Sequence, residues 1–130
     1  MFSLSRESSF YPLSKPFLFL LKSTLARHQE LKKGKYKRFG HPLAGMCYIA
    51  SEALYHSTGG QEVWNVYVMR HNGDTHWFLR RRKDEKVFDL TAEQFDTLPD
   101  YTTARRIGFL TKEPSKRAKI ILEDLRYAAL

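Results

Sequence analysis

The chain has one cysteine, Cys47, and downstream of it lie a histidine, His76, and an aspartate, Asp89. These side-chain types can carry out acyl transfer, because a thiolate attacks a carbonyl carbon, an imidazole delivers the proton and a carboxylate orients the imidazole. Since there is only one thiol, the chain offers one arrangement of this kind. We therefore interpret Cys47 as the candidate nucleophile, His76 as the general base and acid, and Asp89 as the orienting acid.

The residues after Cys47 predict a helix that begins at the cysteine. Its apolar positions recur at helical spacing and are followed by two glycines. These positions are Ile49, Ala50, Ala53 and Leu54, and the glycines are Gly59 and Gly60. The positive end of the helix and its free N–H groups would favour a thiolate and could form an oxyanion hole. The ordinary alternative is that Cys47 is a small buried hydrophobic residue.

His76 and Asp89 both stand in apolar surroundings. Strand alternation places His76 and Phe78 on one face, and the ordinary alternative is a core histidine satisfied by one backbone hydrogen bond. Asp89 lies between Phe88 and Leu90, where a carboxylate is costly to bury unless it is paired. An arginine or the next turn could supply that pairing in place of the histidine.

The pairing of the two strands decides whether these side chains meet. A turn centred on residues 84–85 places Asp89 opposite Arg80 rather than His76. A catalytic triad then needs a turn nearer residues 82–83, or a bulge. The alternative orienting groups are Gln94 and Asp74.

The second oxyanion donor and the substrate contacts are less well marked. No glutamine stands just upstream of Cys47, and Gln29 is distant and predicted to be helical. Tyr48 and His41 are the substitutes that the sequence offers for this donor. The candidate substrate-binding residues are Tyr48, Trp77 and Gln94.

The hydrophobic period predicts an α+β fold in which the Cys47 helix packs on a small antiparallel sheet. Ser14, followed by a lysine and Pro16, indicates the N-terminus of a first helix. We expect residues 1–13 to form an arm and residues 14–130 a single domain. The predicted helices cover residues 15–33, 47–58, 91–98 and 115–128, and the predicted strands cover residues 63–70, 75–82, 87–90 and 107–110.

Composition indicates a protein that works in a reducing cytoplasm without a metal or cofactor. The 130 residues are 42% hydrophobic, which suffices for a packed core. One cysteine excludes an intramolecular disulfide and a multi-cysteine zinc site. The apolar run at residues 17–21 is short and is followed by Lys22, so we predict neither a signal peptide nor membrane association.

The formal net charge of +8 suggests an acidic partner. An acidic protein or peptide substrate is the leading expectation. Nucleic acid stays open as an alternative, although no RNA-recognition or zinc-finger motif accompanies the basic groups. The sequence gives no indication of the oligomeric state.

Taken together, these motifs resemble the papain-like and transglutaminase-like fold group. The residues that show the resemblance are Cys47 in the Gly45-x-Cys47 motif, His76 followed by Trp77, and Asp89. The chain is more specifically similar to small bacterial and phage proteins of the YunG-like type. The shared segments are Asp-Leu-Thr-x-x-Gln-Phe from residue 89, Gly-Phe-Leu-Thr from residue 108, and Pro-Ser-Lys-Arg-Ala from residue 114. The resemblance implies a Cys-His-Asp triad and no particular substrate.

Two functions are therefore carried forward. The first is a cysteine-dependent hydrolase or acyl transferase, peptidase-like, that acts on an amide, isopeptide or thioester bond. The second is a non-catalytic basic binding module on the same fold, such as a phage-type inhibitor of a host factor or a nucleic-acid binder. An enzyme should have an accessible and reactive thiol, whereas a module should have an inert one.

Overall fold

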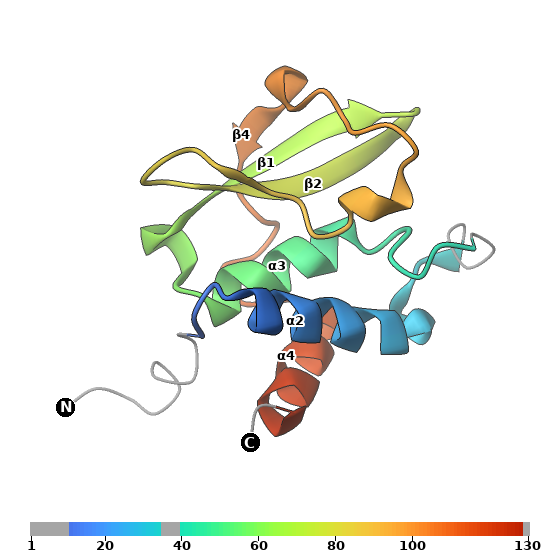
Figure 1. The fold of residues 1–130 in the computed structure, drawn as a ribbon, viewed down its shortest axis with the longest axis vertical. Helices are drawn as coiled ribbons and strands as arrows, with labels where there is room; N and C mark the ends of the chain where they lie inside the picture. Colours follow the sequence, from blue (N-terminus) through green and yellow to red (C-terminus); the bar gives the residue numbers. More distant parts are fainter. Residues whose placement is uncertain (1–10, 35–39, 129–130) are drawn as a thin grey trace.

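The structure is a computed structural model that describes residues 11–34 and 40–128. Within these residues the fold is mixed α+β, with three α-helices and one small antiparallel sheet of four strands (Figure 1). The helices are α2 (Lys15–Arg27), α3 (Cys47–Ser57) and α4 (Lys116–Ala128). The strands are β1 (Trp64–His71), β2 (Asp74–Arg81), β3 (Val87–Phe88) and β4 (Arg105–Ile107), in the spatial order β3-β2-β1-β4.

Helix α3 is the centre of the molecule. The sheet lies on one side of it, and α2 and α4 lie on the other (Figure 1). Its apolar positions Ile49, Ala50, Ala53 and Leu54 are all buried, as the sequence predicted. Small residues at two of these positions let the helix approach its neighbours closely. A helix that is covered on both sides is held firmly, and so is the residue at its first position.

Helix α2 begins as predicted and ends earlier than predicted. The Ser14 hydroxyl accepts a hydrogen bond from the Phe17 N–H at 3.2 Å, and Pro16 lies in the first turn. The prediction that the helix runs to about residue 33 is wrong, because His28 leaves the helical conformation and a short 3-10 turn follows. The apolar spacing of α2 continues to Leu31 in this turn, so the sequence pattern does not show where the helix ends.

Most of the predicted N-terminal arm, residues 1–10, lies outside the described residues. Its last part packs on the domain. The Tyr11 N–H donates to the Ser57 carbonyl at 2.8 Å, and the Tyr11 ring stacks on Phe17 with 5.0 Å between centroids.

The β1–β2 hairpin forms where the sequence predicted it. Asn72 and Gly73 both have positive φ, at 53° and 81°, and this backbone suits a two-residue hairpin turn. Val66 pairs with Leu79, and Met69 pairs with His76. Val66 and Leu79 belong to the buried core beside α3.

The turn after β2 is centred on residues 83–84 rather than on residues 84–85, so Asp89 does not come opposite Arg80. Arg80 pairs with Val87, and Leu79 pairs with Phe88. The loop of residues 82–85 closes with Glu85 at a φ of 59°. Strand β3 ends at Phe88, so Asp89 follows the strand instead of lying within it.

The last third of the chain differs from its prediction in two further places. The expected helix over residues 91–98 is only a 3-10 turn, Ala92–Gln94, in which Thr91 makes no side-chain capping bond. The expected strand at 107–110 is instead β4, which pairs with β1 through residues 105–107. Helix α4 forms as expected and buries Ala118, Ile121 and Leu125. No helix in the described ranges has the length and apolar character needed to cross a bilayer.

Candidate active site

Cys47 is the first residue of α3 and is half-buried. Gly45 has a φ of 78°, a left-handed conformation that a residue with a side chain adopts at a cost, and it turns the chain into the helix. The N-cap residue Met46 makes no side-chain cap bond. The Cys47 N–H has no acceptor among the residues that the structure describes, and this donor is therefore free to bind a ligand.

Because β3 is short, it leaves the first part of the β2 edge uncovered, and Cys47 lies at that edge. Strand β3 pairs only with Leu79 and Arg80, so the edge of β2 before them is not covered by that strand. The Cys47 Sγ lies 4.0 Å from the Thr75 carbonyl oxygen at this edge. The nucleophile candidate therefore lies next to the backbone that carries His76.

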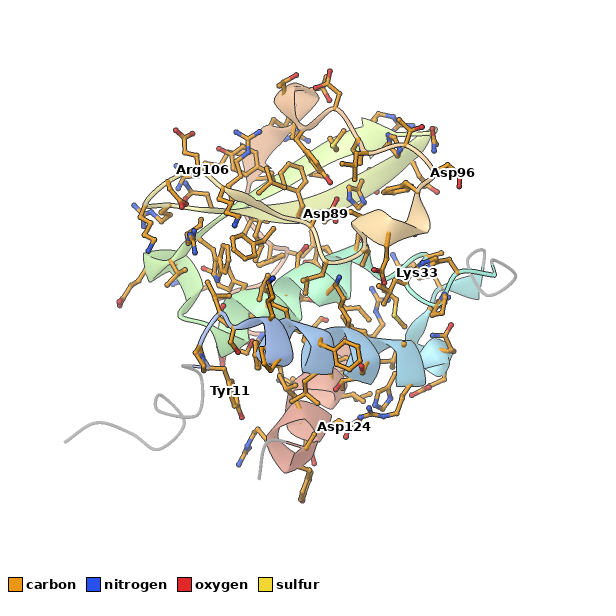
Figure 2. The ribbon with its side chains drawn as sticks, in the orientation of Figure 1. Tyr11, Lys33, Asp89, Asp96, Arg106 and Asp124 are labelled. Atoms are coloured by element: carbon orange, nitrogen blue, oxygen red, sulfur yellow. The ribbon has the colours of Figure 1, made fainter. Side chains whose placement is uncertain are left out.

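His76 and Asp89 form a buried hydrogen-bonded pair. The His76 Nε2 lies 2.6 Å from the Asp89 Oδ2, and each side chain is only 3% exposed. By extension of the register, Asp89 comes opposite Phe78, which places its side chain on the face that holds His76. Figure 2 shows Asp89 where the chain leaves the sheet. Asp89, rather than Gln94 or Asp74, therefore accepts the hydrogen bond from this histidine.

Tyr101 is a third member of this group. Its hydroxyl donates to the Asp89 Oδ2 at 2.7 Å. Burial and the nearby Asp89 carboxylate raise the pKa of Tyr101, so the hydroxyl keeps its proton and acts as a donor. The Tyr101 ring packs edge-on against Phe78 at 4.9 Å, and Phe95 packs against His76 at the same centroid distance. These rings shield the pair from water.

The environment of His76 favours its protonated form. Burial lowers the pKa of His76, but the hydrogen bond with Asp89 and the interaction with Cys47 outweigh that effect and raise it to about 9. The imidazole therefore carries a positive charge at neutral pH. Because Asp89 occupies Nε2, the nitrogen left for the sulfur is Nδ1. An imidazolium beside a thiol favours the thiolate.

Cys47 lies between two hollows that share Gly45, Cys47 and Thr75. The larger one, of about 580 Å³, is here named the histidine pocket. Its distinctive walls are His41, His71, His76, Gln94 and Phe95. The smaller one, of about 240 Å³, is here named the basic pocket. Its distinctive walls are Lys33, Tyr48, Trp77, Leu110 and Arg117.

His41 lines the histidine pocket. The Leu43 N–H donates to the His41 Nδ1 at 3.0 Å, so the neutral imidazole must hold its proton on Nε2. Tyr48 is oriented differently, because its hydroxyl accepts from the Leu110 N–H at 2.9 Å on the side of the basic pocket. Gln29 donates to two carbonyls, those of Ala26 and Pro42. Of the two predicted substitutes, His41 shares the pocket that His76 lines, whereas Tyr48 does not.

The three predicted substrate-binding residues all line a hollow beside the sulfur. Gln94 lines the histidine pocket. Tyr48 and Trp77 line the basic pocket, where their rings meet edge to face at 4.7 Å. Asp74, the other alternative orienting group, also lines the histidine pocket. Over the ranges that the structure describes, no group of three or more histidine, cysteine or acidic residues could hold a metal ion.

Sequence reasoning missed Tyr101 and Phe95 as site residues. Tyr101 lies twelve positions after Asp89 in a segment without regular periodicity, and only the folded chain shows that the two meet. Phe95 was noticed only as part of a motif. Arg117 lies in the predicted Pro-Ser-Lys-Arg-Ala segment, but neither it nor Lys33 is among the predicted site residues. No spacing rule connects residues 33 and 117, which line the same pocket, and Arg117 is held beside this part of the chain by its hydrogen bond to the Leu31 carbonyl.

Comparison of the chain with protein-family models, with curated proteins and with solved structures finds no match in any of the three. The geometry of Cys47, His76 and Asp89 is therefore the main indication of function.

Proposed function

We propose that this protein is a cysteine-dependent hydrolase or acyl transferase that acts on an amide, isopeptide or thioester bond. One observation carries the proposal. The buried 2.6 Å hydrogen bond between His76 and Asp89 leaves the second ring nitrogen for a half-buried cysteine that opens into a pocket of about 580 Å³. A cysteine that was merely packed would need neither the oriented imidazole nor the open pocket.

The first half of the reaction acylates the enzyme. The Cys47 thiolate attacks the carbonyl carbon, and the carbonyl oxygen becomes an oxyanion that receives hydrogen bonds from the Cys47 N–H and the His41 Nε2–H. The imidazolium of His76 gives its Nδ1 proton to the leaving group as the scissile bond breaks. The products are a free amine or thiol and an acyl-Cys47 thioester.

The second half of the reaction releases the acyl group. The neutral imidazole of His76 takes a proton from water, or from an acceptor amine, as its oxygen or nitrogen attacks the thioester. The carbon–sulfur bond breaks, and Cys47 returns to the thiolate beside a protonated His76. Asp89 holds the ring in place during both transfers through its hydrogen bond to Nε2.

The arrangement of elements supports a papain-like, transglutaminase-like assignment as part of this proposal. The nucleophile begins a helix, α3, that packs on an antiparallel sheet, and the histidine lies on the adjacent strand β2. The carboxylate follows the end of β3. A thiol nucleophile must stay reduced, which suits the cytoplasm.

The alternative of a non-catalytic basic module finds less support in the contacts. Three consecutive arginines, at and just after the end of β2, bond to groups within the protein. Arg80 donates to the Tyr101 carbonyl, Arg81 pairs with Asp84, and Arg82 donates to the Gln61 carbonyl. These contacts fix the side chains to the fold rather than presenting them as a row of phosphate ligands.

The pH dependence of Cys47 alkylation by iodoacetamide tests the proposed function. We expect alkylation of the native protein to persist at pH 6, where an ordinary thiol is almost wholly protonated. In His76→Ala the reaction at pH 6 should be lost and should reappear only at alkaline pH. The matched control His28→Ala removes a histidine–carboxylate pair that is remote from the sulfur, and it should leave the profile in place. A thiol that reacts only after denaturation would refute the enzyme and favour the binding module.

A further inference from the structure

The two hollows beside Cys47 differ in charge, and that difference bears on the substrate. His76 lines the histidine pocket and not the basic pocket. The same holds for His41. In the proposed reaction the leaving group must lie within reach of His76, because this residue supplies its proton. The leaving group and the oxyanion therefore occupy the histidine pocket, and the remaining substituent of the carbonyl carbon, the acyl chain, extends into the basic pocket.

Neither cationic side chain of the basic pocket forms an ion pair with a carboxylate in the described part of the chain. Arg117 is half-buried and donates one hydrogen bond, from Nη1 to the Leu31 carbonyl at 2.9 Å. Its guanidinium has five N–H donors in a fixed fork, so most of them remain for a ligand. Lys33 is exposed and forms no ion pair with any described residue. Figure 2 shows Lys33 beyond the end of α2, on the side where α3 begins.

The nearby buried carboxylate of Glu52 forms no ion pair with Arg117. Glu52 lies one helical turn after Tyr48 on α3 and is fully buried. One of its oxygens accepts the Ser115 N–H at 2.8 Å, and the other accepts the Ser115 hydroxyl at 2.6 Å. Both oxygens are thus engaged at the start of α4, so Arg117 is left without a carboxylate partner.

The size and the walls of the basic pocket suit one acidic side chain. A volume of about 240 Å³ is smaller than the roughly 300–1,000 Å³ of pockets that enclose whole small molecules. Trp77 and Tyr48 supply flat apolar walls for an aliphatic stem, and Arg117 and Lys33 supply the cationic end.

From these observations we infer that the acyl portion of the substrate carries a carboxylate, which Arg117 and Lys33 bind in the basic pocket. The inference rests on the proposed function and goes beyond it, because it specifies the substrate on the acyl side of the scissile bond. A peptide with glutamate at that position has the required chemistry, since its carboxylate lies a few bonds from the reacting carbonyl.

A pair of matched electrophiles tests the inference. N-acetyl-glutamyl vinyl sulfone and its glutaminyl counterpart have nearly the same shape and differ in one charge. In each probe the alkene carbon β to the sulfone takes the place of the reacting carbonyl carbon. It bonds to the Cys47 sulfur to form a thioether, and a proton goes to the carbon next to the sulfone. The labelling rate of each is followed by intact-protein mass spectrometry. We expect the glutamyl probe to label the wild type about tenfold faster at low salt, with a smaller preference in 1 M NaCl.

Charge variants assign the preference to the pocket. In Lys33→Gln and in Arg117→Gln the ratio of the two rates should fall toward one. Arg117→Gln also removes the hydrogen bond to the Leu31 carbonyl and could unfold the chain. Lys33→Gln does not carry this risk, because Lys33 makes no hydrogen bond or ion pair with the described residues, so this variant decides the test on its own. Lys83→Gln removes the same charge far from the sulfur and should keep the wild-type ratio.

The outcomes separate the inference from the proposed function. If iodoacetamide does not label native Cys47, the proposed function fails and the probes have nothing to report. If iodoacetamide labels Cys47 while the wild type shows a ratio near one, the proposed function stands and the inference is overturned. A ratio that persists in Lys33→Gln and Arg117→Gln also overturns it.

Discussion

The chain contains two histidine–aspartate pairs of nearly the same length, and only one of them has the features of an active site. The His76 Nε2 lies 2.6 Å from Asp89, and the His28 Nε2 lies 2.7 Å from Asp124. In the second pair the side chains are 20% and 33% exposed, against 3% for each side chain of the first. Distance alone therefore does not distinguish a structural pair from a catalytic one.

The other contacts of each pair make the distinction. The His28 Nδ1 is bonded to Glu30, so neither ring nitrogen is left for a nucleophile. The Asp124 Oδ2 is also bonded to the guanidinium of Arg27 at 3.0 Å. Asp89 instead has the neutral hydroxyl of Tyr101 as its further partner, and its charge is left for the imidazolium. A catalytic pair needs one ring nitrogen free and a carboxylate that no second cation neutralises.

The two pairs should differ most in the free energy of unfolding that is lost when the aspartate of each is removed. Asp89→Ala leaves a buried imidazolium without its partner, and we expect it to lower the free energy of unfolding by about 3 to 5 kcal/mol. Asp124→Ala opens a pair that water already reaches, and its cost should stay below about 1 kcal/mol. Urea unfolding at pH 6 measures both. Equal losses would show that burial does not separate the two pairs.

Reactivity of Cys47 should show the next largest effect. We expect His76→Gln to slow alkylation at pH 6 about a hundredfold, because the thiol then loses the cationic neighbour that favours its reactive form. His28→Gln removes the other imidazole and should change the rate less than twofold. Initial rates with iodoacetamide, followed by mass spectrometry, give both numbers. A similar slowing in the two variants would point to a general loss of structure.

The contrast between these pairs also shows what sequence could and could not predict. Local rules were enough for the Ser14 cap, the Asn72–Gly73 hairpin and the helix that starts at Cys47, because each depends on neighbouring residues. The contact of His76 with Asp89 depends on the length of one turn, where a shift of one residue moves the predicted partner.

The missed features depend on parts of the chain that are distant in sequence. Tyr101 reaches Asp89 from an irregular segment, and the basic pocket joins Lys33, beyond the 3-10 turn that follows α2, with Arg117 in the first turn of α4. The end of α2 at Arg27 was missed because apolar spacing continues through the following 3-10 turn. The sequence pattern therefore predicts the elements that carry the site better than it predicts the contacts that close it.

Alkaline pH should weaken the buried pair over a defined range. The folded-state pKa of His76 is raised to about 9 from an ordinary value of 6.5. A raised histidine pKa stabilises the folded protein fully below pH 6.5, and this contribution is lost as the pH rises through about 9. We expect the free energy of unfolding to fall more steeply between these pH values in Cys47→Ala than in the same variant carrying His76→Gln.

Two comparisons sharpen this pH experiment. The Cys47→Ala background removes one of the interactions that raise the pKa of His76, so the loss should be complete somewhat below pH 9. The pKa of His28 is also raised, through Glu30 first and then Asp124, but solvent screens that pair. Adding His28→Gln should therefore change the slope much less than adding His76→Gln. Equal changes of slope would argue against a special role for the buried pair.

The smallest expected effect concerns the third partner of each aspartate. Tyr101→Phe removes the hydroxyl that donates to Asp89 and keeps the ring that packs on Phe78 at 4.9 Å. We expect it to cost about 1 to 2 kcal/mol of unfolding free energy, since it deprives a buried carboxylate of one hydrogen bond. Arg27→Gln removes the corresponding donor to Asp124, where water can replace it, and should cost less than about 0.5 kcal/mol.

The alkylation rate of Cys47 in Tyr101→Phe tests whether the Tyr101 hydroxyl or the Asp89 carboxylate orients His76. Asp89 still accepts the hydrogen bond of His76 in this variant, so alkylation of Cys47 should slow less than fivefold. If Tyr101 only positions Asp89, the variant should react more slowly than the wild type when folded and at the same rate when both are unfolded in urea. The pH profile of the folded variant should keep its shape. If Tyr101→Phe abolished alkylation as completely as His76→Gln, the hydroxyl rather than the carboxylate would be the group that orients the imidazole.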